Sequence, residues 1–111
     1  MNITNVLVVD DDIVVCRIVH RMLSNEQCKV QTSQSVADAL GAIGQKLFDV
    51  YVMDYKLPDG SGLDVAERIR SKGSEAPIIL AGLSQLEAIG TRKCLKISKR
   101  VEKVSPTKRI F

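Results

Sequence analysis

Residues 49–63 read DVYVMDYKLPDGSGL, and this stretch decides the fold. Its continuous apolar run, residues 50–53, predicts a strand buried on both faces, as in a parallel sheet covered by helices. Asp54 ends the run, and residues 56–62 are dense in the Pro, Asp, Gly and Ser residues that chain reversals need. Apolar residues at helical spacing begin at Leu63. The stretch therefore predicts a strand, an acidic strand end, a turn and a helix, in that order.

Strands and helices alternate along the rest of the chain. Apolar runs at residues 6–9 and 77–81 predict two more buried strands, and the alternating segment 28–32 predicts a half-exposed strand at a sheet edge. Helical periodicity follows each of the first three strands. The residues at helical spacing are Val15, Ile18, Val19 and Met22, then Val36, Leu40, Ile43 and Leu47, then Leu63, Ala66 and Ile69. The second of these sets is expected to form a buried stripe. This alternation is typical of an α/β fold with a parallel sheet.

The C-terminal part carries weaker signals. Residues 101–103 predict a brief fifth strand, and Ser105 followed by Pro106 predicts the start of a helix that the chain ends before completing. We therefore expect one domain over residues 1–111, with its fifth helix incomplete from about residue 106. Apolar sheet surface left open by that helix would make the protein a marginal monomer or a homodimer.

Composition limits the class of protein. An apolar fraction of 45% and a charged fraction of 26% in 111 residues are typical of a soluble globular domain. The sequence has no apolar run of membrane-spanning length and opens with no signal-peptide pattern. Its three cysteines lie far apart without a C-x-x-C pair, which argues against a zinc site. We expect a cytoplasmic protein that is not associated with a membrane.

The two parts of the chain differ in charge. Residues 1–91 hold 8 basic and 12 acidic residues, whereas residues 92–111 hold 8 basic residues and 1 acidic residue. A basic tail suits a nucleic acid or an acidic partner, but a solvated tail is the commoner case. With aromatic residues at 4% and no recognised DNA-reading motif, we expect no direct nucleic-acid binding.

Acidic residues follow two of the predicted strands. Asp10, Asp11 and Asp12 come directly after the first strand, and Asp54 ends the third. The carboxyl ends of parallel strands share one rim of the sheet, so these carboxylates are expected to meet there and repel one another. A cation relieves that repulsion, and ligation by oxygen alone suits Mg²⁺ or Mn²⁺. A helix N-terminus would explain one or two acids after the first strand, but not Asp54 on the same rim.

Four segments together resemble a known family. The segments are LVVDDD (7–12), DVYVMDYKLPDGSGL (49–63), APIILAG (76–82) and VEK (101–103). In order and spacing they resemble the receiver domains of response regulators in two-component signalling, over roughly residues 4 to 108. The resemblance implies a doubly wound, flavodoxin-like α/β fold with a five-stranded parallel sheet in the order 2-1-3-4-5. We expect the last strand and helix of that fold to be degraded or truncated here.

The resemblance also implies roles for single residues. Asp54 would be the phosphoacceptor and also a ligand of Mg²⁺ or Mn²⁺, and Asp11 would be a direct ligand of the same ion. Asp10 would be an acid that acts through water or from a second ligand position. Lys56 would lend its backbone carbonyl to the metal, and Lys103 would pair with the phosphoryl group. The implied partner is a sensor histidine kinase or a phosphotransfer protein that donates from phosphohistidine. Such a domain catalyses only its own phosphorylation and dephosphorylation and is not otherwise an enzyme.

Three positions depart from the pattern of that family. Gly82 stands where receivers carry a Ser or Thr hydroxyl, and Ser84, two residues on, is expected to cap a helix instead. Arg100 replaces the usual aromatic residue, and Val104 replaces a proline. We expect phosphoryl acceptance to survive these changes, because the acids remain.

Two other functions are weighed against the phosphoacceptor. Gly82 and Arg100 favour a phosphorylation-independent adaptor, a pseudo-receiver that works by protein–protein interaction. A phosphohydrolase of the aspartyl-phosphate kind ranks last. Such enzymes carry a second acid two residues after the nucleophile, and that position is Lys56 here.

Overall fold

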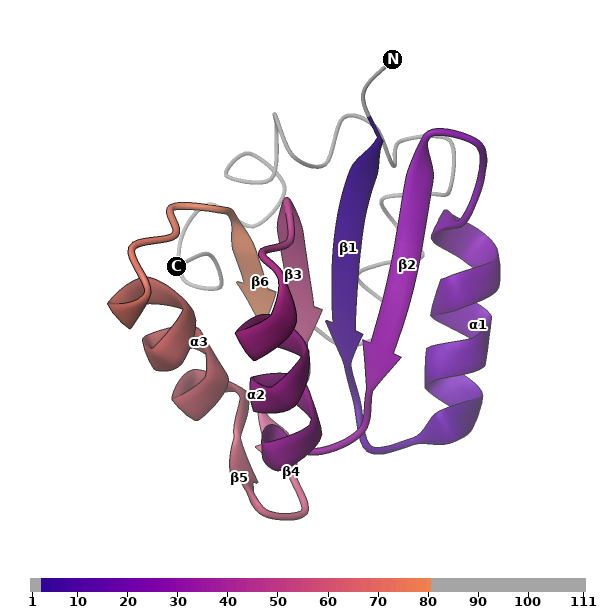
Figure 1. The fold of residues 1–111 in the computed structure, drawn as a ribbon. Helices are drawn as coiled ribbons and strands as arrows, with labels where there is room; N and C mark the ends of the chain where they lie inside the picture. Colours follow the sequence, from indigo (N-terminus) through magenta and orange to yellow (C-terminus); the bar gives the residue numbers. More distant parts are fainter. Residues whose placement is uncertain (1–2, 81–111) are drawn as a thin grey trace.

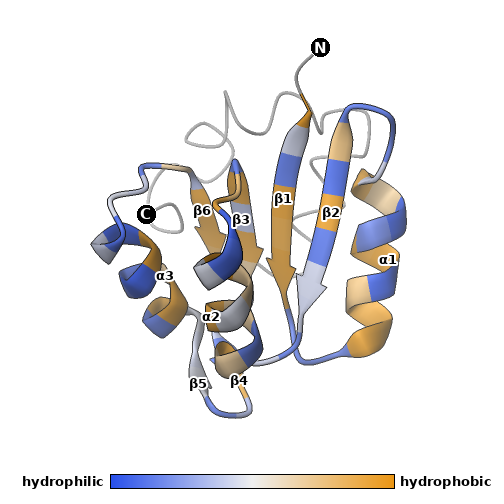
Figure 2. Cartoon of the chain, viewed as in Figure 1, coloured by the Kyte–Doolittle hydropathy of each residue, from blue (hydrophilic) through white to orange (hydrophobic). Residues whose placement is uncertain are grey.

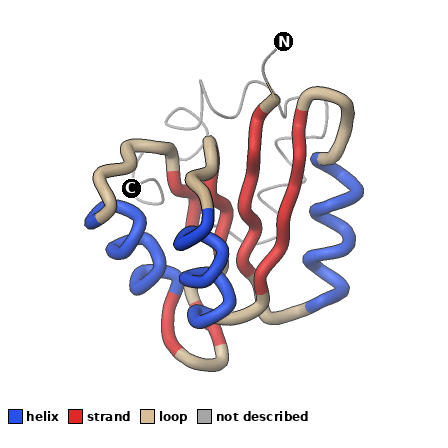
Figure 3. The backbone as a smooth tube through the Cα atoms, viewed as in Figure 1, coloured by secondary structure: helices blue, strands red, loops and turns tan. Residues whose placement is uncertain are grey.

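The computed structural model describes residues 3–80 (Figure 1). The strands are β1 (Thr4–Val9), β2 (Cys28–Ser33), β3 (Val50–Met53), β4 (Lys56–Leu57), β5 (Gly60–Ser61) and β6 (Ile78–Leu80). The helices are α1 (Ile13–Leu23), α2 (Val36–Gln45) and α3 (Gly62–Ser71). Strands and helices alternate as the sequence predicts, and the short β4–β5 hairpin is inserted between β3 and α3 (Figure 3).

The main sheet has four strands in the order β2-β1-β3-β6, and every neighbouring pair is parallel. In β1 and β3, Val6 pairs with Val50 and Val9 with Met53, so these two central strands end level with each other. Since β6 is the fourth strand of the main sheet, the order agrees with the first four strands of the predicted 2-1-3-4-5 arrangement. The fifth strand and fifth helix expected at 101–103 and from 106 lie outside the described residues.

Helices cover both faces of this sheet. Along β1, Leu7 and Val9 belong to a core cluster with residues of α2 and α3, while Val6 and Val8 belong to a second cluster with residues of α1. This division follows from the period of two in a strand, which sends successive side chains to opposite faces. Figure 1 shows α2 and α3 together on one side of the sheet, with α1 beside β2 on the other. All four residues from Val6 to Val9 are buried, as expected for a central parallel strand.

The edge strand β2 has the half-exposed pattern that the sequence predicts. Cys28 is buried, whereas Lys29 and Gln31 are exposed. Hydropathy along β2 alternates accordingly, while β1 is mostly apolar (Figure 2). Within the described sheet β2 lies at one end of the strand order, which leaves one side of the strand without a neighbour there.

The residues that the helices bury differ in part from the apolar positions at helical spacing, and the predicted buried stripe of α2 is partly wrong. In α1 the buried residues are Cys16, Val19 and Leu23, while Ile18 is 39% exposed. Residues 16, 19 and 23 share one helix face, and Ile18 lies a full 100° away from Val19.

Leu47 is exposed because α2 ends before it, with Lys46 as the C-cap. In α2 the small residues Ala39 and Ala42 are buried together with the predicted Val36 and Ile43. In α3, Val65, Ala66 and Ile69 are buried, while Leu63 is exposed.

Among the helices of residues 3–80, none is both long enough and apolar enough to span a bilayer.

Candidate functional site

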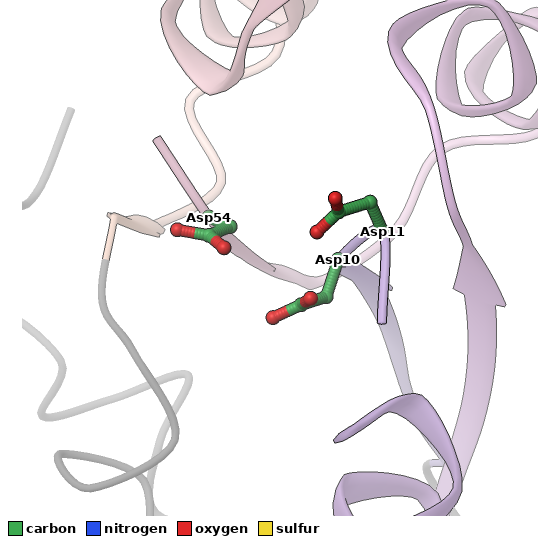
Figure 4. A group of neighbouring side chains, drawn as sticks. All are labelled: Asp10, Asp11 and Asp54. Atoms are coloured by element: carbon green, nitrogen blue, oxygen red, sulfur yellow. The ribbon is translucent and has the colours of Figure 1, made fainter. Parts of the chain in front are cut away.

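Three carboxylates meet at the carboxyl ends of β1 and β3. Asp10 and Asp11 follow β1, and Asp54 follows β3. Each offers one oxygen, and these oxygens all lie within 4.8 Å of one another. Figure 4 shows the side chains of Asp10 and Asp11 directed toward the side on which Asp54 lies. The two strands are hydrogen-bonded neighbours, which brings residues 44 positions apart in the sequence to the same rim. The meeting of these acids at one rim, predicted from the sequence, is present.

The backbone holds both strand ends in place. The Asp54 amide donates to the Val9 carbonyl oxygen at 2.9 Å, and the Asp10 amide donates to the Ser33 carbonyl oxygen at 3.0 Å. The Asp10 carbonyl oxygen also accepts from the Cys16 thiol, with the sulfur 3.2 Å away. Burial raises the pKa of this thiol to about 11, so it stays protonated and keeps its role as donor at neutral pH. These contacts fix the loop from which the acids project.

Asp12 has a different task from its two neighbours. It is the N-cap of α1, and its Oδ1 accepts from the Val14 amide at 2.9 Å. Its own amide donates to Oδ1 of Asp10 at 2.9 Å, which orients the Asp10 carboxylate. The helix-terminus interpretation of these acids is therefore correct for Asp12, while Asp10 and Asp11 join Asp54.

The electrostatics of the cluster favour a cation. Partial burial raises the pKa of Asp10, and the negative charges of Asp54, Asp11 and Asp12 raise it further, against the lowering effect of the hydrogen bond from the Asp12 amide. The repulsion between crowded, ionised carboxylates costs free energy as long as no positive charge lies between them. A divalent ion with oxygen ligands removes it, because each carboxylate then faces a positive charge instead of another anion.

The spacing of the oxygens also fits such an ion. Ligands at about 2.1 Å in an octahedron lie roughly 3 to 4 Å from one another. The carboxylate oxygens of Asp10, Asp11 and Asp54, all within 4.8 Å of one another, lie close to that spacing. Mg²⁺ keeps several waters when it binds to proteins, so a cluster of three acids on an open rim suits it better than an all-protein cage would. Manganese takes the same oxygen donors.

The chain leaves the site through a hairpin that packs closely against Asp54. Strands β4 and β5 are antiparallel, with Lys56 paired to Ser61, and the Gly62 amide donates to the Tyr55 carbonyl oxygen at 2.9 Å. A Cβ on Gly62 would overlap the backbone carbonyl oxygen of Asp54 and would lie 2.9 Å from Cδ2 of Leu80. Gly62 is therefore needed for a close approach of two backbones, a requirement that the sequence interpretation had assigned only to the turn.

Asp59, at the tip of this hairpin, has a role that sequence reasoning missed. Its Oδ1 accepts from the Val36 amide at 2.7 Å and its Oδ2 from the Ala37 amide at 3.0 Å. These hydrogen bonds lower the pKa of Asp59. An aspartate between Pro58 and Gly60 is an ordinary turn residue in sequence terms, and no local signal points to partners more than twenty positions away.

Several predicted site residues cannot be placed. Lys103, Gly82, Ser84, Arg100 and Val104 all lie outside the described residues. Lys56 is the first residue of β4, and its side chain is exposed.

Comparison with known proteins gives the family. The model of the response regulator receiver domain matches residues 6–104. The probable transcriptional regulatory protein TcrX of Mycobacterium tuberculosis is 39% identical over 75 residues, which cover 68% of this chain and 32% of TcrX. The chain thus matches about a third of the length of this curated relative.

Solved structures agree with this result. The chemotaxis response regulator CheY4 of Vibrio cholerae superposes with a TM-score of 0.66 at 27% identity, covering 71% of this chain and 68% of CheY4. The response regulator TrrA of Thermotoga maritima, solved in complex with Mg²⁺ and BeF, gives a TM-score of 0.65 at 32% identity, covering 70% and 68%. The chain belongs to the response regulator receiver domain family.

Proposed function

We propose that this domain is a phosphoacceptor of two-component signalling, in which Asp54 receives a phosphoryl group with the help of Mg²⁺ or Mn²⁺. The observation that carries the proposal is the convergence of oxygens from Asp10, Asp11 and Asp54 within 4.8 Å at the ends of two adjacent parallel strands. In open α/β sheets, ligands bind at this rim, where the strand order reverses. Membership in the receiver family and the Mg²⁺–BeF complex of TrrA both support it.

The proposed chemistry is a single in-line transfer. A carboxylate oxygen of Asp54 attacks phosphorus, the new O–P bond forms as the N–P bond to the donor imidazole breaks, and the imidazole nitrogen keeps the electron pair. A bound divalent ion supplies positive charge that offsets the repulsion between carboxylates and phosphoryl oxygens. Asp11 would hold the ion directly, Asp10 directly or through water, and Lys56 through its backbone carbonyl. Lys103 would pair with the phosphoryl oxygens.

The donor proposed is a protein, either a sensor histidine kinase or a phosphotransfer protein. Helix α1 begins two residues after Asp11 and exposes three apolar side chains: Ile13 (50%), Val14 (56%) and Ile18. Apolar side chains grouped beside a reactive site are typical of a surface that another protein covers. A cytoplasmic location follows from the same proposal, since the donor's phosphohistidine must reach this rim.

The test is intact-mass spectrometry after incubation with acetyl phosphate and Mg²⁺, with Asp54→Asn as the matched variant. The expected result is the gain of one phosphoryl group by the parent alone, abolished by a chelator of divalent ions. A folded, Mg²⁺-binding parent that gains no mass would contradict the proposal.

The second candidate, a phosphorylation-independent adaptor, is favoured by Gly82 and Arg100, which replace the hydroxyl and the aromatic residue of the family pattern. One measurement distinguishes the adaptor from the phosphoacceptor. Partner binding that is equally tight for the parent and for Asp54→Asn, with or without acetyl phosphate, supports the adaptor.

A further inference from the structure

The tip of the β4–β5 hairpin is tied to helix α2 by one side chain. Both carboxylate oxygens of Asp59 are used, one for the Val36 amide at 2.7 Å and the other for the Ala37 amide at 3.0 Å. These are the first two residues of α2, whose amides have no partner within the helix. Hydrogen bonds to an ionised carboxylate are stronger than neutral ones, and the helix dipole favours a negative charge at this end.

Helix α2 has its own cap without this contact. Ser35 is the N-cap, and its hydroxyl oxygen accepts from the Asp38 amide at 3.0 Å. Asp38 in turn accepts from the Gln34 amide at 3.2 Å. Because Ser35 already caps α2, the helix keeps its N-terminal cap without Asp59, whereas the hairpin tip has its link to α2 through Asp59.

The fit at the hairpin tip is close. A Cβ on Gly60 would lie 2.7 Å from Oδ2 of Asp64 and 3.1 Å from Cγ2 of Val36. The residue after Asp59 therefore lies against Val36 at the start of α2 and against Asp64 in the first turn of α3, and a Cβ there would have to displace the Asp64 carboxylate. Residues 58–60 are exposed, but these contacts hold the tip of the hairpin close to both helix starts.

This hairpin carries the residue proposed to complete the metal site. Lys56 opens β4 two residues after Asp54, and β4 with β5 forms a separate two-stranded sheet. The main ladder consequently does not set the position of the Lys56 carbonyl. Among the described residues, the hairpin is anchored by the buried Leu57, by the hydrogen bond from the Gly62 amide to the Tyr55 carbonyl, and by Asp59.

We infer that Asp59 is a positioning residue for the metal site: by clamping the hairpin to the start of α2, it fixes the backbone carbonyl of Lys56 relative to Asp54 and Asp11. The inference rests on the proposed function, because it takes Lys56 as a metal ligand. Residues that hold metal ligands in position without touching the metal typically change the metal affinity by about 10- to 100-fold when they are removed.

Calorimetric titration with Mg²⁺ tests this on the parent, Asp59→Ala and Asp38→Ala. Asp38→Ala is the matched control, because it also removes an acid that accepts a backbone hydrogen bond at the start of α2. The Kd for Mg²⁺ is expected to rise about tenfold in Asp59→Ala and less than about twofold in Asp38→Ala. Amide hydrogen exchange should show faster exchange of Val36 and Ala37 in Asp59→Ala only, which confirms loss of the clamp independently of the metal.

Asp59→Asn adds a graded variant. Its amide oxygen still accepts one hydrogen bond but carries no charge, so a Kd between those of the parent and Asp59→Ala is expected. If circular dichroism shows that Asp59→Ala has lost helix, Asp59→Asn against Asp38→Asn carries the comparison.

Equal Mg²⁺ affinity in the Asp59 and Asp38 variants would overturn the inference. The mass-spectrometric test of the parent is read separately. A parent that binds Mg²⁺ but accepts no phosphoryl group contradicts the proposed function and leaves the Asp59 comparison valid. A parent that accepts phosphoryl while Asp59→Ala keeps full Mg²⁺ affinity contradicts the inference alone. A parent that binds no Mg²⁺ contradicts both.

Discussion

The backbone carbonyl oxygen of Asp54 occupies the space that a Cβ on Gly62 would need. The chain thus turns back through the hairpin and passes directly against the residue that ends β3. Leu80 of β6 closes the same space from the other side, 2.9 Å from that Cβ position. The placement of the Asp54 backbone therefore depends on a glycine eight residues later in the chain.

Gly62→Ala is expected to destabilise the fold by about 1–3 kcal/mol, because the added methyl group must displace backbone as well as side-chain atoms. Urea unfolding followed by circular dichroism measures this. Gly41→Ala is the control: an added Cβ there meets nothing within 4 Å, and the position is exposed inside α2. That variant should gain about 0.5–1 kcal/mol. Equal effects of the two substitutions would contradict the close approach.

Asp59 should make stability depend on acid pH. Its pKa is lowered from 3.8 by hydrogen bonds from the Ala37 and Val36 amides, so its contribution is fully present above pH 3.8 and is lost as pH falls through the lower folded value. The parent should unfold at higher urea than Asp59→Asn at pH 7, and the two midpoints should converge as pH falls below 3.8 through the lowered folded pKa. A gap between the midpoints that is constant over this range would show that the charge is not involved.

Asp10 should behave in the opposite sense. Burial and the neighbouring carboxylates raise its pKa, so its ionised form costs stability, and the cost grows as pH rises from 3.8 through the raised value. Without divalent ions, Asp10→Asn is therefore expected to unfold at higher urea than the parent at pH 7. Mg²⁺ at 100 times its Kd should stabilise the parent by about 2.7 kcal/mol and Asp10→Asn by less. An unfolding midpoint of the parent that is the same with and without Mg²⁺ would contradict the proposed metal site.

Tyr51→Phe is expected to weaken the fold and spare the site. The buried Tyr51 hydroxyl oxygen accepts from the Phe48 amide at 3.0 Å, and the two rings contact edge to face with centroids 5.7 Å apart. Removing the hydroxyl leaves a buried amide without its acceptor, which costs about 1–3 kcal/mol. The Mg²⁺ affinity measured by calorimetry should equal that of the parent. A loss of affinity would mean that the start of β3 also affects the acids at its end.

The parts of this structure that were predictable from sequence are those encoded locally or by family resemblance. The β-branched run at 6–9 indicates a buried central strand whatever surrounds it, and the acids that follow it fall at the strand end by necessity. The meeting of Asp10 with Asp54 needed the further assumption of parallel neighbouring strands.

The contacts that escaped prediction depend on three-dimensional placement. The hydrogen bonds from Val36 and Ala37 to Asp59 exist only because α2 and the hairpin start from the same rim of the sheet. The exposure of Ile18 depends on which face of α1 turns toward the sheet, and a helix that is apolar on more than one side leaves that choice open.

The separate task of Asp12 has a consequence for engineering. Because α1 takes its N-cap from Asp12, Asp11 and Asp54 can be neutralised or bound to an ion without removing the cap of that helix. The chain thus divides its acids between a scaffold group and reactive groups. Libraries of polar and acidic residues at Asp11 and Asp54 can be screened for new cation preferences in a domain whose first helix keeps its N-cap.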